Sequence, residues 1–289
     1  MKKWMLSAFV YLAFVVGGYS AYDAIFVKEE KEVIYANVKA SAPGKEIQEA
    51  SVHVEEGEHG LNKHTEEGHG HGSAKTENEV KISVEEEKGN LLISLKDLSG
   101  NPVVDLEISH EKLLHLIVVD EHLNEYYHLH PEEVAPGEFS VPSNLKDGKY
   151  KAFVDIKSAS LPYEVEPIPF NVGNSATDDH SHASLAIDQE LVKTINGRKV
   201  TMKTTELVSG QPVTLTFDVH GAKLEPYLGA MGHVVILDEQ AEEYLHVHPH
   251  NDQETIFETE FSTPGIYKVW AEFSQEGIVT VYPFVIEVK

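Results

Sequence analysis

The stretch HLIVVDEHLNEYYHLHP, from His115 to Pro131, decides the fold that we expect for this chain. It begins with an apolar, β-branched run, continues through a short polar segment, and ends with a run of aromatic and apolar residues that contains two histidines. Two such runs around polar turn residues are typical of an antiparallel β-hairpin. The stretch therefore predicts one strand over His115–Asp120 and a second over Tyr126–Pro131.

The histidines of this hairpin are predicted to share one face. A turn centred near His122 and Leu123 places His115 opposite His130, with His128 on the diagonal. Side chains alternate along a strand, so His128 and His130 point to the same side. Residues that face each other on paired strands also share a side, with Cβ atoms about 4.5–5.5 Å apart. Three imidazole rings should therefore converge on one patch near the end of a strand.

The same phrase recurs 118 residues later as HVVILDEQAEEYLHVHP, which carries His233, His246 and His248 at identical spacing. A later segment, GKYKAFVD (148–155), matches GIYKVWAE (265–272) in the same way. A repeat of about 100 residues indicates tandem domains rather than a solenoid. Each repeat contains several short strand-like runs between turn residues, which predicts an all-β chain of two antiparallel β-sandwiches, immunoglobulin-like or cupredoxin-like.

The start of the chain is predicted to anchor it to a membrane. Lys2 and Lys3 precede an apolar run from Trp4 to about Val27. Lysines on that side favour cytoplasmic retention of the N-terminus and export of the rest, and the run is long enough to span a bilayer. We expect an uncleaved anchor; the alternative is a cleaved signal peptide that releases a secreted protein.

Composition shifts along the chain predict its domain boundaries. The expected parts are a signal-anchor helix (1–27), an acidic histidine-rich linker (28–78), a first β-sandwich (79–173), a short linker (174–184) and a second β-sandwich (185–289). The first linker has almost no apolar residue to bury and is predicted to be disordered. Its histidines are either loose metal ligands or part of a solvated spacer; they are His53, His59, His64, His69 and His71.

Charge and cysteine content exclude several function classes. The chain carries 48 Asp and Glu against 23 Lys and Arg, a net charge of −25 at pH 7. It should attract cations and repel nucleic acid and anionic lipid surfaces. There is no cysteine, which removes disulfides, thiolate zinc sites, iron–sulfur clusters and blue-copper centres.

Three neutral imidazoles suit a divalent metal ion. Zinc and copper both accept this ligand set, and the divalent affinity order favours copper. The candidate ligands are His115, His128 and His130 in the first repeat and His233, His246 and His248 in the second. A fourth ligand could be water or a carboxylate. Asp155 and Glu272 stand at matching positions, and the sequence leaves open whether they reach the histidines. The alternative is a buried hydrogen-bond network at the end of the sheet.

The segments HEKLLHLIVVDEHLNEYYHLHPE and LEPYLGAMGHVVILDEQAEEYLHVHP resemble a group of exported bacterial proteins that carry H-E-K-x-x-H-L-I-V-V…H-x-H-P or Y-L-G-A-x-G-H…H-V-H-P phrases. The resemblance covers both β-domains, about two-thirds of the chain. It implies a secreted or anchored β-sandwich that handles copper or another heavy metal.

These observations predict a non-enzymatic metal-binding protein outside the cytoplasm, with one three-histidine site in each β-domain, that buffers or transfers copper or zinc. Its expected partners are a divalent metal ion and a membrane metal transporter or other cell-surface protein. A structural or adhesive tandem sandwich remains an alternative. A hydrolase that activates water on the metal is another, although no general base repeats alongside the histidines.

Overall fold

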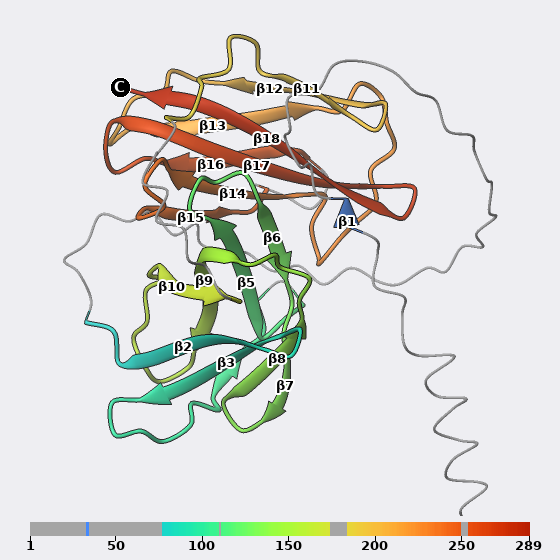
Figure 1. Cartoon of the computed structure of the whole chain (residues 1–289). Helices are drawn as coiled ribbons and strands as arrows, with labels where there is room; N and C mark the ends of the chain where they lie inside the picture. Colours follow the sequence, from blue (N-terminus) through green and yellow to red (C-terminus); the bar gives the residue numbers. More distant parts are fainter. Residues whose placement is uncertain (1–32, 35–76, 110, 174–183, 250–253) are drawn as a thin grey trace, which may run out of the picture. The chain divides into compact units, whose positions relative to one another are not determined.

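The computed structural model describes residues 33–34, 77–109, 111–173, 184–249 and 254–289 (Figure 1). The predicted anchor, and nearly all of the two predicted linkers, lie outside these residues. Among the residues that are described, no helix is long and apolar enough to cross a membrane. The segment Val33–Lys289 forms one compact unit.

The described residues form β-strands in two successive groups. The first group contains β2 (Val80–Glu87), β3 (Asn90–Asp97), β4 (Leu106–Glu107), β5 (Leu114–Asp120), β6 (Tyr126–Leu129), β7 (Glu132–Ala135), β8 (Glu138–Pro142), β9 (Gly148–Ser158) and β10 (Ile168–Val172). The second contains β11 (Val192–Ile195), β12 (Arg198–Thr204), β13 (Pro212–Asp218), β14 (His233–Asp238), β15 (Tyr244–Val247), β16 (Ile256–Glu260), β17 (Gly265–Gln275) and β18 (Ile278–Val288).

Each group folds into two antiparallel sheets. In the first repeat, one sheet has the order β10-β9-β5-β6, with β4 also paired to β9, and the other has the order β2-β3-β8-β7. In the second repeat, β18-β17-β14-β15 faces β11-β12-β13-β16, and the short β1 (Val33–Ile34) pairs in parallel with β18. The prediction of an all-β chain with two tandem antiparallel sandwiches is confirmed.

Each sandwich has its own apolar core because its strands alternate between buried and accessible residues. In β3, for example, Leu91, Ile93 and Leu95 are fully buried while their neighbours are partly accessible. Full burial of such a side chain contributes about 1.5–3 kcal/mol. Alternation of this kind is typical of an antiparallel sheet with one face on a core.

The central strands β5 and β14 differ, because they are buried on both faces. In β5, Leu116 and Val118 pack in the core of the first sandwich, whereas Ile117 and Val119 point the other way into a third apolar cluster. This third cluster, here called the inter-repeat cluster, combines Ile117, Val119, Leu123, Tyr126 and Phe153 with Val235, Leu237, Ala241, Trp270 and Val281. The two sandwiches therefore pack against each other through the β5 and β14 sheets.

Matching residues make matching contacts in the inter-repeat cluster. Tyr126 stacks on Trp270 with ring centroids 4.9 Å apart, and Tyr244 stacks on Phe153 at 5.1 Å. Tyr126 and Tyr244 occupy matching positions in the two repeats, and so do Phe153 and Trp270. Each tyrosine stacks on the aromatic residue of the other repeat, so this contact has the reciprocity of a two-fold interface.

Two lysines extend the same pattern to the hairpin turns. Lys268 Nζ donates to the Leu123 carbonyl at 2.5 Å, and Lys151 Nζ donates to the Gln240 and Ala241 carbonyls at 2.8 and 3.3 Å. Leu123 and Ala241 occupy matching turn positions with φ of 55° and 53°. Each repeat thus holds the hairpin turn of the other.

Candidate metal centre

The two hairpins position the candidate ligands. In the first, Leu116 pairs with Leu129 and Ile117 with His128, so extending the register by one residue sets His115 opposite His130, as predicted. The strand β6 ends at Leu129, two residues earlier than predicted, and His130 directly follows it. Since His115 and Ile117 lie on the same side of β5, the histidines face the other repeat.

The second hairpin repeats this register. Val234 pairs with Val247 and Val235 with His246, and the same extension sets His233 opposite His248. We call the two groups of histidines the first triad (His115, His128, His130) and the second triad (His233, His246, His248). Within each triad, the ligand atoms all lie within 4.8 Å of one another. The sequence therefore predicts correctly which histidines come together in each repeat.

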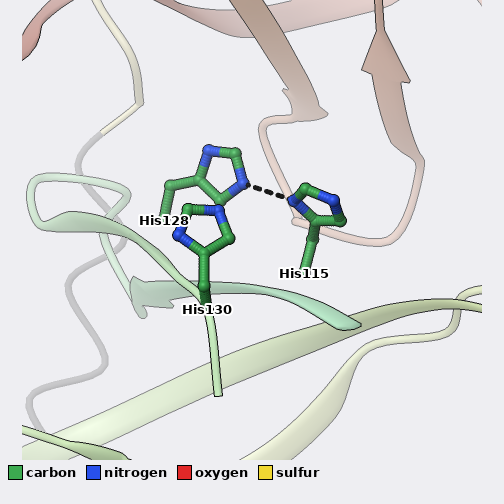
Figure 2. Close-up of side chains that lie close together, drawn as sticks. All are labelled: His115, His128 and His130. Atoms are coloured by element: carbon green, nitrogen blue, oxygen red, sulfur yellow. Dashed lines mark hydrogen bonds between the residues drawn. The ribbon is translucent and has the colours of Figure 1, made fainter. Parts of the chain in front are cut away.

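The three rings of the first triad lie close together (Figure 2), and two of them are buried. His115 Nδ1 lies 3.2 Å from His128 Nε2, and the ring of His130 lies 5.1 Å from that of His115 and 4.7 Å from that of His128. His115 and His128 are each 2% exposed, whereas His130 is half-buried. In the second triad, His233 is fully buried, the side chain of His246 is 4% exposed, and His248 is half-buried.

A backbone carbonyl fixes the first histidine of each triad. His115 Nε2 donates to the Ser109 carbonyl at 3.0 Å, and His233 Nε2 donates to the Tyr227 carbonyl at 2.9 Å. Both carbonyls lie six residues before their histidine. A carbonyl only accepts hydrogen bonds, so Nε2 carries the proton in each ring and Nδ1 keeps its lone pair for the triad.

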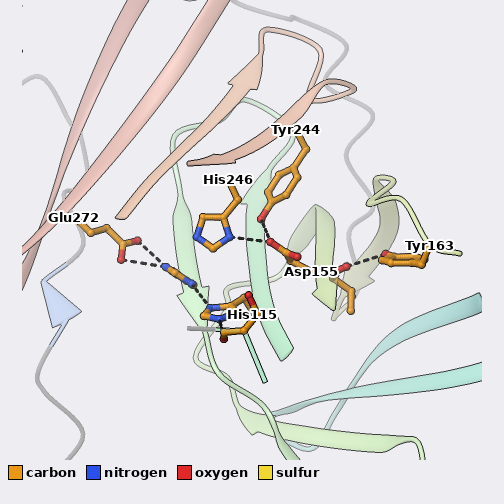
Figure 3. A network of polar contacts seen from close by, with 9 residues as sticks. His115, Asp155, Tyr163, Tyr244, His246 and Glu272 are labelled. Carbon is orange, nitrogen blue, oxygen red and sulfur yellow. Dashed lines mark hydrogen bonds and ion pairs between the residues drawn. The ribbon is translucent and has the colours of Figure 1, made fainter. Parts of the chain in front are cut away.

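A carboxylate from the other repeat fixes the second histidine (Figure 3). His128 Nδ1 lies 3.2 and 3.1 Å from the two carboxyl oxygens of Glu272, and His246 Nδ1 lies 2.8 Å from Asp155 Oδ2. Contact through Nδ1 directs Nε2 of both rings toward their own triads. Carboxylates that hold a metal-binding histidine in this way set its orientation and raise its basicity.

The strand register explains why these carboxylates reach across. Asp155 in β9 pairs with His115 in β5, and Glu272 in β17 pairs with His233 in β14. Each carboxylate therefore lies beside one triad and contacts a histidine of the other. The sequence repeat shows that Asp155 and Glu272 occupy matching positions, but it does not show which histidines they contact. The continuous apolar runs around His115 and His233 are a signal that could have indicated covered outer faces, because strands buried on both sides lose alternation.

Matching tyrosines complete the two carboxylate contacts. Tyr126 Oη donates to Glu272 Oε1 at 2.6 Å, and Tyr244 Oη donates to Asp155 Oδ2 at 3.2 Å. Both tyrosines also belong to the stacked pairs between the repeats. The apolar contact and the polar network are thus built from the same side chains.

Burial favours the neutral form of three triad histidines, His128, His130 and His233. Burial, with the charges of His115 and His246, holds the pKa of His128 well below its usual value, and burial with the charges of His128 and His246 does the same for the pKa of His233. Burial likewise lowers the pKa of His130. The neutral ring is the form that binds a metal ion.

The pKa values of the two carboxyl groups shift in opposite directions. Burial raises the pKa of Glu272 above its usual range. Burial also acts to raise the pKa of Asp155, but the hydrogen bond and charge of His246 outweigh it and hold that pKa below the usual value.

The two triads are neighbours rather than separate sites. The His246 ring lies 5.4 Å from that of His115 and 5.5 Å from that of His128, and the His128 and His233 rings are 5.8 Å apart. Distances within the triads run from 4.4 to 6.0 Å. The six rings therefore form one cluster at the contact between the repeats.

His220 lies near the second triad in the sequence but does not extend this cluster. His220 is exposed and contacts Thr201 Oγ1 at 2.8 Å. His110 and His250 lie outside the described residues.

A family model described as "Domain of unknown function (DUF8832)" matches residues 67–173 and again residues 193–289, which together make up more than half of the sequence. The chain belongs to this family. Each DUF8832 match contains one triad, so the duplication of the domain is also the duplication of the histidine group. Among curated proteins, none matches the sequence.

Three solved structures that match the chain share little of its sequence. A segment of two fibronectin type-III domains from chicken tenascin shares 8% identity and a TM-score of 0.25, over 73% of this chain and 100% of its own. The FN1–FN3 domains of chicken CNTN1 share 11% and 0.21, over 72% and 66%. Murine CEACAM1b shares 12% and 0.21, over 73% and 99%. Scores this low add nothing to the fold shown by the strands themselves.

The donor set of this DUF8832 chain fits a copper or zinc ion. His130 Nε2 and His246 Nε2 are shielded from water and have no hydrogen-bond partner within the described residues. A buried polar atom without a partner costs about 1–3 kcal/mol. An ion bound in each triad would give the buried nitrogen of that triad a partner.

Proposed function

We propose that this DUF8832 protein binds copper or zinc ions through its two histidine triads, and that it does so as a binding protein rather than an enzyme. The observation that supports this most is the convergence of six histidines from matching positions into two groups whose ligand atoms lie within 4.8 Å. Burial favours the neutral form of His128, His130 and His233, and four of the six rings are oriented by a carbonyl or carboxylate contact. This is the condition of a metal site before it takes its ion.

The ligand set suits buffering or transfer. Three imidazoles leave a position open on a four-coordinate ion, and an incoming ligand from a partner can occupy it before the ion leaves. Nitrogen ligands favour Cu²⁺ over Zn²⁺ in intrinsic affinity, so the ion carried depends on which is available.

The N-terminal sequence supports action outside the cytoplasm. Two lysines before a long apolar run favour export of the β-domains on a membrane anchor. An anchored carrier would meet a membrane metal transporter or another cell-surface protein as its partner. The net charge of −25 would concentrate cations near the protein and disfavour nucleic acid.

One contact favours a second candidate function. His115 Nδ1 and His128 Nε2 lie 3.2 Å apart and pair directly. A purely structural network of this kind would stabilise an adhesive tandem sandwich without any ion. The two candidates differ in whether the folded protein retains metal.

Metal retention is best measured in a chain without loosely binding histidines. In this background variant, the histidines of the two linkers are replaced by alanine; they are His53, His59, His64, His69, His71, His180 and His182. The full-length chain in detergent is loaded with Cu²⁺ or Zn²⁺, washed, and assayed by elemental analysis. We expect two ions per chain, one for each triad.

Two further variants control this experiment. Replacing the six triad histidines by alanine should abolish retention, whereas His220→Ala should not change it, because that side chain is exposed. Circular dichroism confirms that each variant keeps its β-structure. A folded background variant that retains no ion overturns the proposed function and favours the structural network.

A further inference from the structure

We propose that the two triads hold their ions as one dinuclear metal centre at the contact between the repeats, in which the carboxylate of each repeat positions a histidine that binds the other repeat's ion. This inference rests on the proposed function and deepens it. It replaces two independent sites, one in each domain, with a single centre to which both repeats contribute.

The spacing of the rings supports one centre. The distance from His246 to His115, 5.4 Å between ring centroids, equals the distance from His115 to His128 inside the first triad. His128 lies closer to His246 of the second triad than His233 does, at 5.5 against 6.0 Å. The distances between the triads, 5.4 to 5.8 Å, therefore overlap those within them.

The two carboxylates link the triads, because each belongs to one repeat and contacts a histidine of the other. Glu272 holds His128 of the first triad but pairs in the sheet with His233 of the second. Asp155 holds His246 of the second triad but pairs with His115 of the first. A shift of β9 or β17 on metal binding would therefore affect both triads. Each of these strands pairs with the strand that carries a ligand of its own repeat, and each carries the carboxylate that positions a histidine of the other repeat.

Charge balance indicates what else the centre would take. Two cations close together in a poorly solvated site repel each other strongly. Asp155 and Glu272 supply at most two negative charges, when both are ionised, which neutralise two monovalent ions but only half the charge of two divalent ions. A divalent pair would therefore favour a small oxygen anion, such as hydroxide, as a shared ligand. Bridging oxygen ligands are a common feature of paired-metal sites, whose ions lie about 3.5–4 Å apart.

Paramagnetic copper tests this arrangement directly. The background variant in detergent is loaded with Cu²⁺ and its electron paramagnetic resonance spectrum is recorded. Two single-triad variants, His115→Ala/His130→Ala and His233→Ala/His248→Ala, each provide the spectrum of one isolated ion. These pairs leave His128 and His246 in place, so both carboxylate contacts survive in the controls.

We expect the spectrum of the fully loaded protein to differ from the sum of the two single-triad spectra. Coupling between the ions should broaden the lines, produce a half-field transition, and reduce the integrated signal well below two spins per chain. Bound copper is measured in the same samples by elemental analysis, so that spin and ion counts are compared directly.

The outcomes separate the two proposals. Two bound ions whose spectrum equals the sum of the single-triad spectra overturn the dinuclear centre and leave the proposed function standing. Two bound ions with a coupled spectrum support both. If the folded protein retains neither copper nor zinc, the proposed function fails and the centre fails with it. A single-triad variant that misfolds is replaced by His130→Gln or His248→Gln, which keeps the side chain polar.

Discussion

Asp155 and Glu272 occupy matching positions in the two repeats and make matching contacts, yet their surroundings differ. The Glu272 side chain is 1% exposed and the Asp155 side chain 30% exposed. Burial raises the pKa of Glu272, whereas His246 holds that of Asp155 below its usual value. Duplication has thus preserved a pairing pattern while the environment of each pair has diverged.

This difference indicates unequal roles for the two triads. The first triad depends on a carboxyl group that is sealed from water and held by Tyr126. The second depends on a carboxylate that water still reaches. We therefore expect the first triad to be the more sensitive to substitution and the second to exchange its ion more readily.

The largest expected effect is on stability. Glu272→Ala removes the buried carboxyl group that His128 Nδ1 and Tyr126 Oη contact, and each buried polar group that loses such a contact costs about 1–3 kcal/mol. Asp155→Ala removes a partly hydrated contact and should cost about 1–2 kcal/mol. Urea unfolding of the metal-free protein measures both. Glu121→Ala, which removes an exposed contact to Lys149, is the control and should change little. If the two substitutions lowered the free energy of unfolding equally, the proposed difference between Asp155 and Glu272 would be contradicted.

Next in size is a crossed effect on metal affinity. In a chain that keeps only the first triad, through His233→Ala and His248→Ala, Glu272→Gln should weaken Cu²⁺ binding about 10–100-fold, because Glu272 orients His128. Asp155→Asn in the same background should weaken it less, although Asp155 belongs to the same repeat as that triad. Competition with a coloured copper chelator measures both affinities. The opposite order would mean that each carboxylate serves its own repeat.

The pH dependence of stability follows from the lowered histidine pKa values. An unfolded histidine gains its proton near pH 6.5, but His128 and His233 stay neutral in the fold. Below about pH 6.5 the unfolded state therefore binds more protons, and the free energy of unfolding falls with falling pH. Glu272 acts oppositely, since its raised pKa favours its protonated form in the fold and its contribution is lost as pH rises. Because several histidines act against one glutamate, we expect a net decline.

Thermal unfolding of the metal-free protein from pH 7 to pH 5 measures this decline. The variant that lacks all six triad histidines is the comparison and should show a shallower slope. A slope that is unchanged in that variant would assign the acid sensitivity to groups outside the triads.

The smallest expected effect concerns the two lysines that hold the hairpin turns. Burial lowers the pKa of Lys268 to about 8, whereas Lys151 is partly exposed and also contacts Glu242. An unfolded lysine keeps its proton to about pH 10.4, so between these values the unfolded state binds more protons and stability rises with pH. Lys268→Met should remove this rise, measured by urea unfolding from pH 8 to pH 10. Lys151→Met should leave it in place.

The sequence alone could predict the hairpin, its register and the members of each triad. The alternation of side chains decides which histidines share a face, and the second copy shows that the spacing is kept. It could not predict the partners of Asp155 and Glu272. Alternation says which residues lie on a face but not what covers it, and the covering surface here comes from the other repeat, more than 80 residues away in the chain.

The inter-repeat cluster also could not be predicted from the sequence. Ile117 and Val235 read as ordinary core residues of a sandwich, because apolar residues on either side of a strand look alike. Only the unbroken apolar runs of β5 and β14 indicate that these two strands have no solvated face.

The reciprocal contacts between the repeats have a consequence for how the site responds to dilution. A symmetric pair of separate subunits would complete both triads only above its dissociation constant, so its metal affinity would vary with protein concentration. Here one polypeptide carries both halves, and their meeting is an intramolecular event with a fixed effective concentration. The complete set of ligands and carboxylates is therefore available in a single molecule, however scarce the protein is.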